Sequence, residues 1–114
     1  MSEQEMNTLE LTIEQAREKI SLMETLKRLE ANPDFHTVML KGYFEGEAVR
    51  LVHAKGNPGM TSPESQASII KQIDAIGSLG NYFRSILHNG LMSAKAIEDA
   101  EETKDEILRE ELNK

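Results

Sequence analysis

The sequence has no cysteine and no tryptophan, and aromatic residues are few. Without cysteine, disulfides, thiolate catalysis, iron–sulfur clusters and cysteine-type zinc sites are all excluded. With only two tyrosines and three phenylalanines in 114 residues, the core is expected to be mostly aliphatic, as it is in packed helices. The length is near that of one ordinary domain.

Long apolar runs are also missing. No stretch approaches the roughly 18 residues that a membrane-spanning helix needs. The first ten residues, "MSEQEMNTLE", have neither the basic start nor the apolar segment of a secretory signal. The sequence therefore predicts a soluble protein of the cytoplasm that does not enter a membrane.

Acidic residues outnumber basic ones, 20 to 13, and the formal net charge is −7. The excess lies at the two ends, because residues 33–97 carry five acids and six bases whereas residues 98–114 carry eight acids and three bases. A surface of this sign repels phosphate backbones, so direct nucleic-acid binding is not expected. An anionic ligand would fit best in the near-neutral middle.

Hydrophobic spacing and capping residues predict an all-α fold of three helices, at about 12–31, 33–55 and 63–110. Thr12 is expected to cap the first helix, and Asn32 and Ser62 are expected to cap the second and third, each followed by proline. Gly56 is expected to end the second helix in a left-handed conformation.

The long third helix carries a heptad seam. Its positions are Ile69, Ile73, Ile76, Gly80, Phe83, Leu87, Gly90, Ala94 and Ile97. The seam is longer than a helix of about twenty residues can cover, so we expect a helical hairpin or bundle that forms a homo-oligomer, a dimer or higher. Beyond Ile97 the pattern fails. The expected organisation is a flexible N-terminus at 1–11, a helical domain at 12–97 and an acidic extension, helical or frayed, at 98–114.

Glycines within the second and third helices indicate a contact surface, because each costs about 1 kcal/mol relative to alanine. Gly42 and Gly46 lie four residues apart, and we expect them to pack closely on the third helix; the alternative is a backbone approached by a ligand or partner. The expected contact residues, which include two Tyr-Phe pairs, are Gly42, Tyr43, Phe44, Gly46, Gly80, Tyr82, Phe83, Leu87 and Gly90.

No motif predicts catalysis, a metal site or a cofactor. His36 and His53 are seventeen residues apart, which separates them along one helix, and no histidine pair has metal-binding spacing. Lys41, Arg50 and Arg84 could hold an anionic ligand beside Tyr43; the alternative is ordinary surface charge.

Several short segments carry a resemblance. "NPDF" at 32–35, "GYF" at 42–44, "EAVRL" at 47–51 and "YFR" at 82–84 resemble small uncharacterised helical proteins of tailed bacteriophages, over roughly residues 26–88. The resemblance implies a viral origin, a helical accessory role, and a location in the host-cell cytoplasm or the virion. It implies no catalytic residue.

The expected function is that of a non-enzymatic helical oligomer that acts through protein–protein contacts, as a phage structural or assembly accessory protein with a phage or host protein as partner. The alternative is an anti-defence or host-takeover protein. Such a protein would sequester a small nucleotide or inhibit a host nucleic-acid enzyme through its acidic tail.

Overall fold

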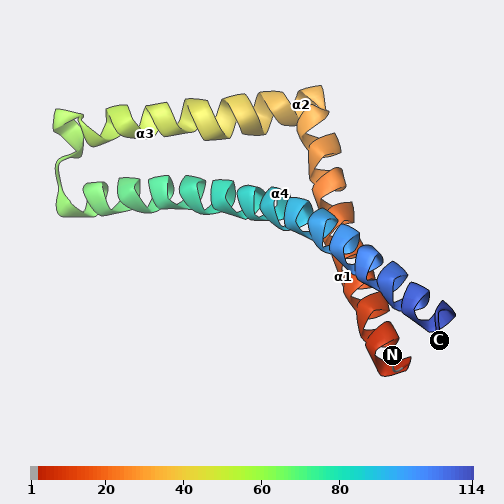
Figure 1. Cartoon of the computed structure of the whole chain (residues 1–114). Helices are drawn as coiled ribbons and strands as arrows, with labels where there is room; N and C mark the ends of the chain where they lie inside the picture. The colour runs from red at the N-terminus through yellow and green to blue at the C-terminus, as the bar shows by residue number, and fades with distance from the viewer. Residues whose placement is uncertain (1–2) are drawn as a thin grey trace. The chain divides into compact units, whose positions relative to one another are not determined.

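The computed structural model describes residues 3–114 and confirms the all-α fold with three long helices (Figure 1). The first is α1, Glu3–Ala31, and the last is α4, Pro63–Leu112. Between them, one continuous helix consists of α2, Pro33–Phe35, a π-helical segment η1, His36–Glu47, and α3, Ala48–Lys55. A 3₁₀ turn, η2, covers Pro58–Met60. The described residues contain no strand.

The second and third helices begin where their caps predict. The Asn32 side chain accepts hydrogen bonds from the backbone N–H groups of Asp34 and Phe35, at 2.9 and 3.1 Å. Ser62 Oγ accepts from the Ser65 N–H at 3.1 Å. Both caps satisfy backbone donors that have no partner in the first helical turn.

The start of α1 differs from the prediction. The helix begins at Glu3, nine residues before Thr12, so the described residues 3–11 are helical. Thr12 lies inside the helix, where its hydroxyl donates to the backbone oxygen of Thr8 at 3.0 Å. A threonine that bonds back into the preceding turn is not a cap.

Gly56 was wrongly expected to be left-handed. Its φ and ψ are −86° and 0°, in the right-handed region. The end of α3 is held instead by Gln66, whose Nε2 donates to the backbone oxygens of Lys55 at 3.0 Å and Met60 at 2.7 Å. A side chain from α4 therefore closes the turn that a glycine was expected to close.

The chain consists of two compact units. The hairpin unit comprises residues 27–84, in which the helix at 33–55 runs antiparallel to the first half of α4 (Figure 1). Its core is built on Leu51, Ile69 and Ile76, and Leu51 is only 1% exposed. Partly buried residues complete this core: Tyr43, Phe44, Ala48, Ala54 and Ile73.

The terminal unit comprises residues 1–26 and 85–114. Met23 lies against Gly90, and Lys104 Nζ lies 3.4 Å from Glu10 Oε1, so α1 and the second half of α4 run antiparallel. The buried residues of this unit are Ile13, Ala16, Met23, Leu26, Ile86, Gly90, Ser93 and Ala100.

The acidic extension is part of this packing. Ala100 is buried, and Lys104 and Ile107 are half-buried, so the buried stripe continues past Ile97, where we expected it to end. From Ile86 onward the stripe runs through Ser93 and Ala100 instead of Leu87 and Ala94. The shift of one residue occurs because the second half of α4 packs on α1, whereas the first half packs on the helix at 33–55.

Candidate functional site

The π-helical segment η1 decides which side chains of the second helix face α4. Phe44 and Leu51 follow Phe35 by nine and sixteen residues, which at about 3.6 residues per turn is about two and a half and four and a half turns. An α-helix would therefore turn both away from the side of Phe35. In a π-helix each N–H donates to the backbone oxygen five residues earlier, and each residue turns the helix by a smaller angle than in an α-helix. All three side chains therefore share one side.

All five aromatic residues of the chain form one connected cluster as a result. Phe83 of α4 is its centre, with ring centroids 5.8 Å from Phe44, 6.2 Å from Phe35 and 6.1 Å from Tyr82. Tyr43 meets Phe44 edge-on at 5.5 Å. Such tilted and edge-to-face pairs stabilise by about 0.5–1.5 kcal/mol beyond their buried area. The two Tyr-Phe segments singled out in the sequence thus meet in the hairpin unit.

The glycines behave differently from one another. Gly80 lies in the contact, because a Cβ added there would be 3.6 Å from Phe44 Cε1. Gly42 and Gly46 are exposed, and the only atoms near an added Cβ are the backbone oxygens of Thr37 at 3.1 Å and Lys41 at 3.3 Å, in the same helix. The expected close packing of Gly42 and Gly46 on the third helix is therefore wrong within this chain, since the π-helix turns them outward.

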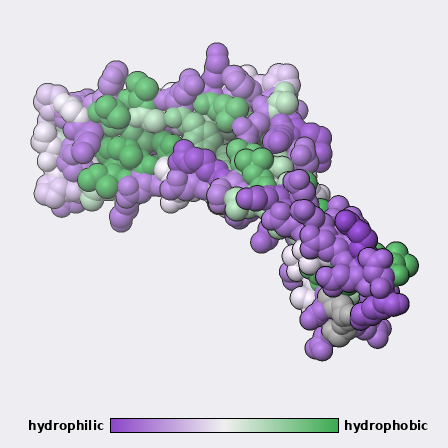
Figure 2. Space-filling view, in the orientation of Figure 1, coloured by the Kyte–Doolittle hydropathy of each residue, from purple (hydrophilic) through white to green (hydrophobic). Residues whose placement is uncertain are grey.

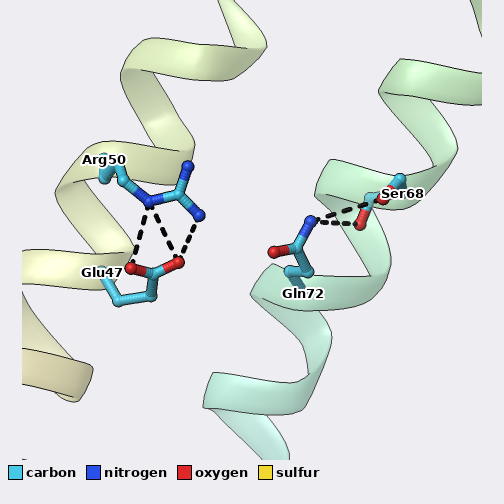
Figure 3. A network of polar contacts seen from close by, with 4 residues as sticks. All are labelled: Glu47, Arg50, Ser68 and Gln72. Atoms are coloured by element: carbon cyan, nitrogen blue, oxygen red, sulfur yellow. Dashed lines mark hydrogen bonds and ion pairs between the residues drawn. The ribbon is translucent and has the colours of Figure 1, made fainter.

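Two edges run along the hairpin unit beside its core, and the first is polar. Arg50 and Ser68 directly precede the buried Leu51 and Ile69, and all four line an open hollow of about 300 Å³. The other lining residues are polar Glu64, Ser65 and Gln72 and apolar Ala54 and Met60. Figure 3 shows Arg50 on α3 and Gln72 on α4 pointing toward each other across this edge.

Glu47 holds Arg50 at the polar edge. The Arg50 Nε–H lies 3.1 Å from each carboxylate oxygen, and Nη2 bonds to Oε1 as well (Figure 3). The hydrogen bond from Arg50 lowers the pKa of Glu47 below its ordinary 4.5, and the same bond raises the pKa of Arg50. The ion pair contributes to folding stability at pH values above the ordinary pKa of Glu47. This contribution is lost as the pH falls through the lowered pKa of Glu47. Because Arg50 is exposed and Glu47 is only half-buried, the contribution of the pair to stability is small.

Only one of the three candidate residues for an anionic ligand lies at the hollow. Arg50 lines the hollow, but Lys41 and Arg84 do not. Arg84 Nη2 donates to Asn81 Oδ1 at 2.6 Å. The charge of Arg50 is balanced by Glu47, and Glu64 adds a second carboxylate at the hollow. The polar edge is therefore a poor site for an anion.

The second edge of the hairpin unit is apolar. Val52 and Ile70 directly follow the buried Leu51 and Ile69, so they lie about a quarter turn from the core, on the side opposite Arg50 and Ser68. Val52 is 63% exposed and Ile70 is 44% exposed. Together with the neighbouring small and branched residues they form what we call the apolar edge: Ala48, Val52, Ile70, Ile73 and Gly77. Figure 2 shows hydrophobic residues gathered over α3 and the first half of α4.

Other kinds of site find little support in the described part of the chain. None of its His, Asp and Glu side chains form a group of three or more that could hold a metal ion. No helix from Glu3 to Leu112 has an apolar stretch long enough to cross a bilayer.

Sequence reasoning missed two residues that shape the molecule. Gln66 closes the turn between α3 and α4, but a glutamine in a helical stretch gives no such signal. Met23 fills the space left by Gly90, and only the heptad position of Gly90 hinted at a close contact there. The apolar edge could have been found from its spacing only if the π-helix had been anticipated.

No protein-family model matches this sequence, and no curated protein or solved structure matches it. The resemblance to tailed-phage proteins therefore stays a prediction from the quoted segments.

Proposed function

We propose that the protein is a non-enzymatic helical oligomer that acts through protein–protein contacts. The observation that supports this is the distribution of hydrophobic side chains. Among the described residues, nine hydrophobic residues are buried, two of them alanine, whereas thirteen large hydrophobic side chains are exposed. Scattered exposed side chains are ordinary, but exposed apolar residues gathered on one side of a helix pair, as on the apolar edge, are typical of an interaction surface.

The architecture of the units agrees with this proposal. Each unit pairs two helices and buries one seam between them. A two-helix layer leaves the outer sides of both helices without partners, and burying them would stabilise an assembly by about 25 cal/mol per Å² of apolar area. Surfaces of this kind bind other helices, including copies of themselves.

The biological role that we propose rests on the resemblance of residues 26–88. A helical oligomer of a tailed phage would act as a structural or assembly accessory protein, in the host-cell cytoplasm or in the virion, with a phage or host protein as partner. The nucleotide-binding alternative has less support, because only Arg50 of the three candidate residues lines the hollow, and Glu47 balances its charge. Inhibition of a host nucleic-acid enzyme through the acidic tail also has less support, because part of the tail packs on α1.

The mass in solution tests the proposal. We expect the purified full chain to sediment as a dimer or larger species, with a mass that rises with protein concentration until the assembly is complete. Sedimentation equilibrium and light scattering measure this directly. A mass equal to one chain at every concentration would overturn the proposal of a self-associating protein.

A further inference from the structure

We propose that a second copy of this chain packs on the apolar edge of the hairpin unit, so that the helices of two hairpin units form a four-helix bundle. This inference rests on the proposed self-association and specifies its surface. The edge carries Val52 and Ile70 at the height of the core residues Leu51 and Ile69. A second layer placed there would extend that core.

Size alternation along the apolar edge suits close helix packing. Val52, Ile70 and Ile73 are branched, and Ala48 and Gly77 are small. A Cβ added at Gly77 would meet nothing within 4 Å, so the surface above it is open. Large residues of one copy can enter the spaces above the small residues of the other, as in four-helix bundles.

The charges favour a second copy at this unit. Residues 27–84 hold seven bases and six acids, a net charge of +1, whereas residues 1–26 and 85–114 hold six bases and fourteen acids, a net charge of −8. Two copies that meet at their hairpin units bring nearly neutral surfaces together. Two copies that meet at their terminal units would bring like charges together, which costs free energy.

The size of the face that carries the apolar edge also fits. The helix at 33–55 has 23 residues and is about 34 Å long at about 1.5 Å per residue, and two helices side by side are about 20 Å wide. The resulting face of about 700 Å² is close to the ~800 Å² that each partner contributes to an interface of standard size. The face of the hairpin unit that carries the apolar edge is therefore large enough to support a stable pair.

Charged substitutions on the two sides of α3 test the proposal. In Val52→Glu and Ile70→Glu, the carboxylate would be buried between copies. We therefore expect the dissociation constant of the dimer, measured by sedimentation equilibrium, to rise at least tenfold. The matched control is Val49→Glu, because Val49 is 55% exposed and lies about half a turn from Leu51, facing away from α4. The control should keep the wild-type dissociation constant.

Cross-linking gives a second measurement that does not depend on stability. The chain has no cysteine, so Ile70→Cys and Val49→Cys each introduce a single thiol. A short bis-maleimide should join two copies of Ile70→Cys and leave Val49→Cys uncross-linked. Circular dichroism checks that each variant remains helical.

The outcomes separate this inference from the proposed function. If Val52→Glu and Ile70→Glu remain dimers with wild-type affinity, the second copy sits elsewhere and the inference is overturned, although self-association stands. If Val49→Cys cross-links as well as Ile70→Cys, the assigned surface is likewise wrong. A wild-type chain that is a monomer at every concentration overturns both.

Discussion

Among single residues, Gly90 shows most directly how a missing side chain permits helix packing. A Cβ added there would lie 2.5 Å from both Cβ and Sδ of Met23 and 2.8 Å from its Cγ. Real contacts are never this short, so any other residue at position 90 must displace Met23 or move α1. Glycine has a lower helix propensity than alanine, but the contact with Met23 leaves no room for a Cβ at position 90.

We predict that Gly90→Ala lowers the free energy of unfolding by about 1–3 kcal/mol, because overpacking outweighs the gain of about 1 kcal/mol in helix propensity. Thermal and urea unfolding followed by circular dichroism measure the change. Met23→Ala alone should also destabilise, because it leaves a cavity. In the double variant the added methyl group partly fills that cavity, so the combined loss should be smaller than the sum. Strict additivity would mean that these two side chains do not compete for space.

The sequence could place Gly90 in a helix contact but could not name its partner. Its heptad position follows from the spacing of Ile76 and Phe83, whereas the identity of the facing residue depends on which helix covers the second half of α4. Gly42 and Gly46 illustrate the opposite case. Their spacing suggested a shared inward face, but η1 turns both toward solvent.

At the scale of the element, the π-helical segment compensates for the spacing of its hydrophobic residues. Phe35, Phe44 and Leu51 can share a side only if the intervening helix turns less than an α-helix does. Without Lys41 and Gly42, Phe44 and Leu51 would follow Phe35 by seven and fourteen residues, about two and about four α-helical turns. The same side chains would then face α4 from an ordinary α-helix.

We therefore predict that deletion of Lys41 and Gly42 keeps the hairpin folded and raises its melting temperature, because α-helical hydrogen bonds have better geometry and one glycine is removed. Deletion of Val49 and Arg50 is the matched control. It removes two residues after Phe44, turns Leu51 about half a turn out of the core, and should lower the melting temperature. Equal destabilisation by both deletions would contradict the register described for η1.

This element also shows the limit of periodicity as a guide. The bounds of the second helix follow from Asn32, Pro33 and Lys55, and the structure agrees with them. Its inward face does not follow, because reading by an α-helical period assigns Gly42 and Gly46 to the side of Phe35. Only contacts with α4 reveal that the chain adopts a wider turn.

For the whole molecule, composition and capping residues were enough to predict an all-α chain with a long third helix, and the structure confirms this. Two boundaries were wrong for a shared physical reason. The residues before Thr12 and after Ile97 are rich in charge, and neither segment alone has a clear hydrophobic pattern. In the structure, however, Lys104 pairs with Glu10, and half-buried Met6 and Leu9 lie on the packed side of α1. Pairing between the two ends of a chain cannot be seen from either end by itself.

The uneven charge has a consequence for the behaviour of the assembled protein in salt. The terminal unit carries −8 and the hairpin unit +1, so carboxylates repel one another mainly at the ends of the chain. Glu110 and Glu111 also lie in the last turn of α4, at the negative end of its dipole. Dissolved salt screens exposed charges beyond about 10 Å at 0.1 M. Apolar contacts are not screened.

We accordingly predict that sodium chloride raises the melting temperature. The dissociation constant of the dimer should stay the same as at low salt or fall. Melting followed by circular dichroism and sedimentation equilibrium across a salt series measure the two effects. Glu101→Gln combined with Glu102→Gln should raise the melting temperature at low salt and flatten its dependence on salt, because both side chains are exposed in the acidic segment. A dimer that dissociates as salt increases would be held by opposite charges, and the apolar edge would then not be its contact surface.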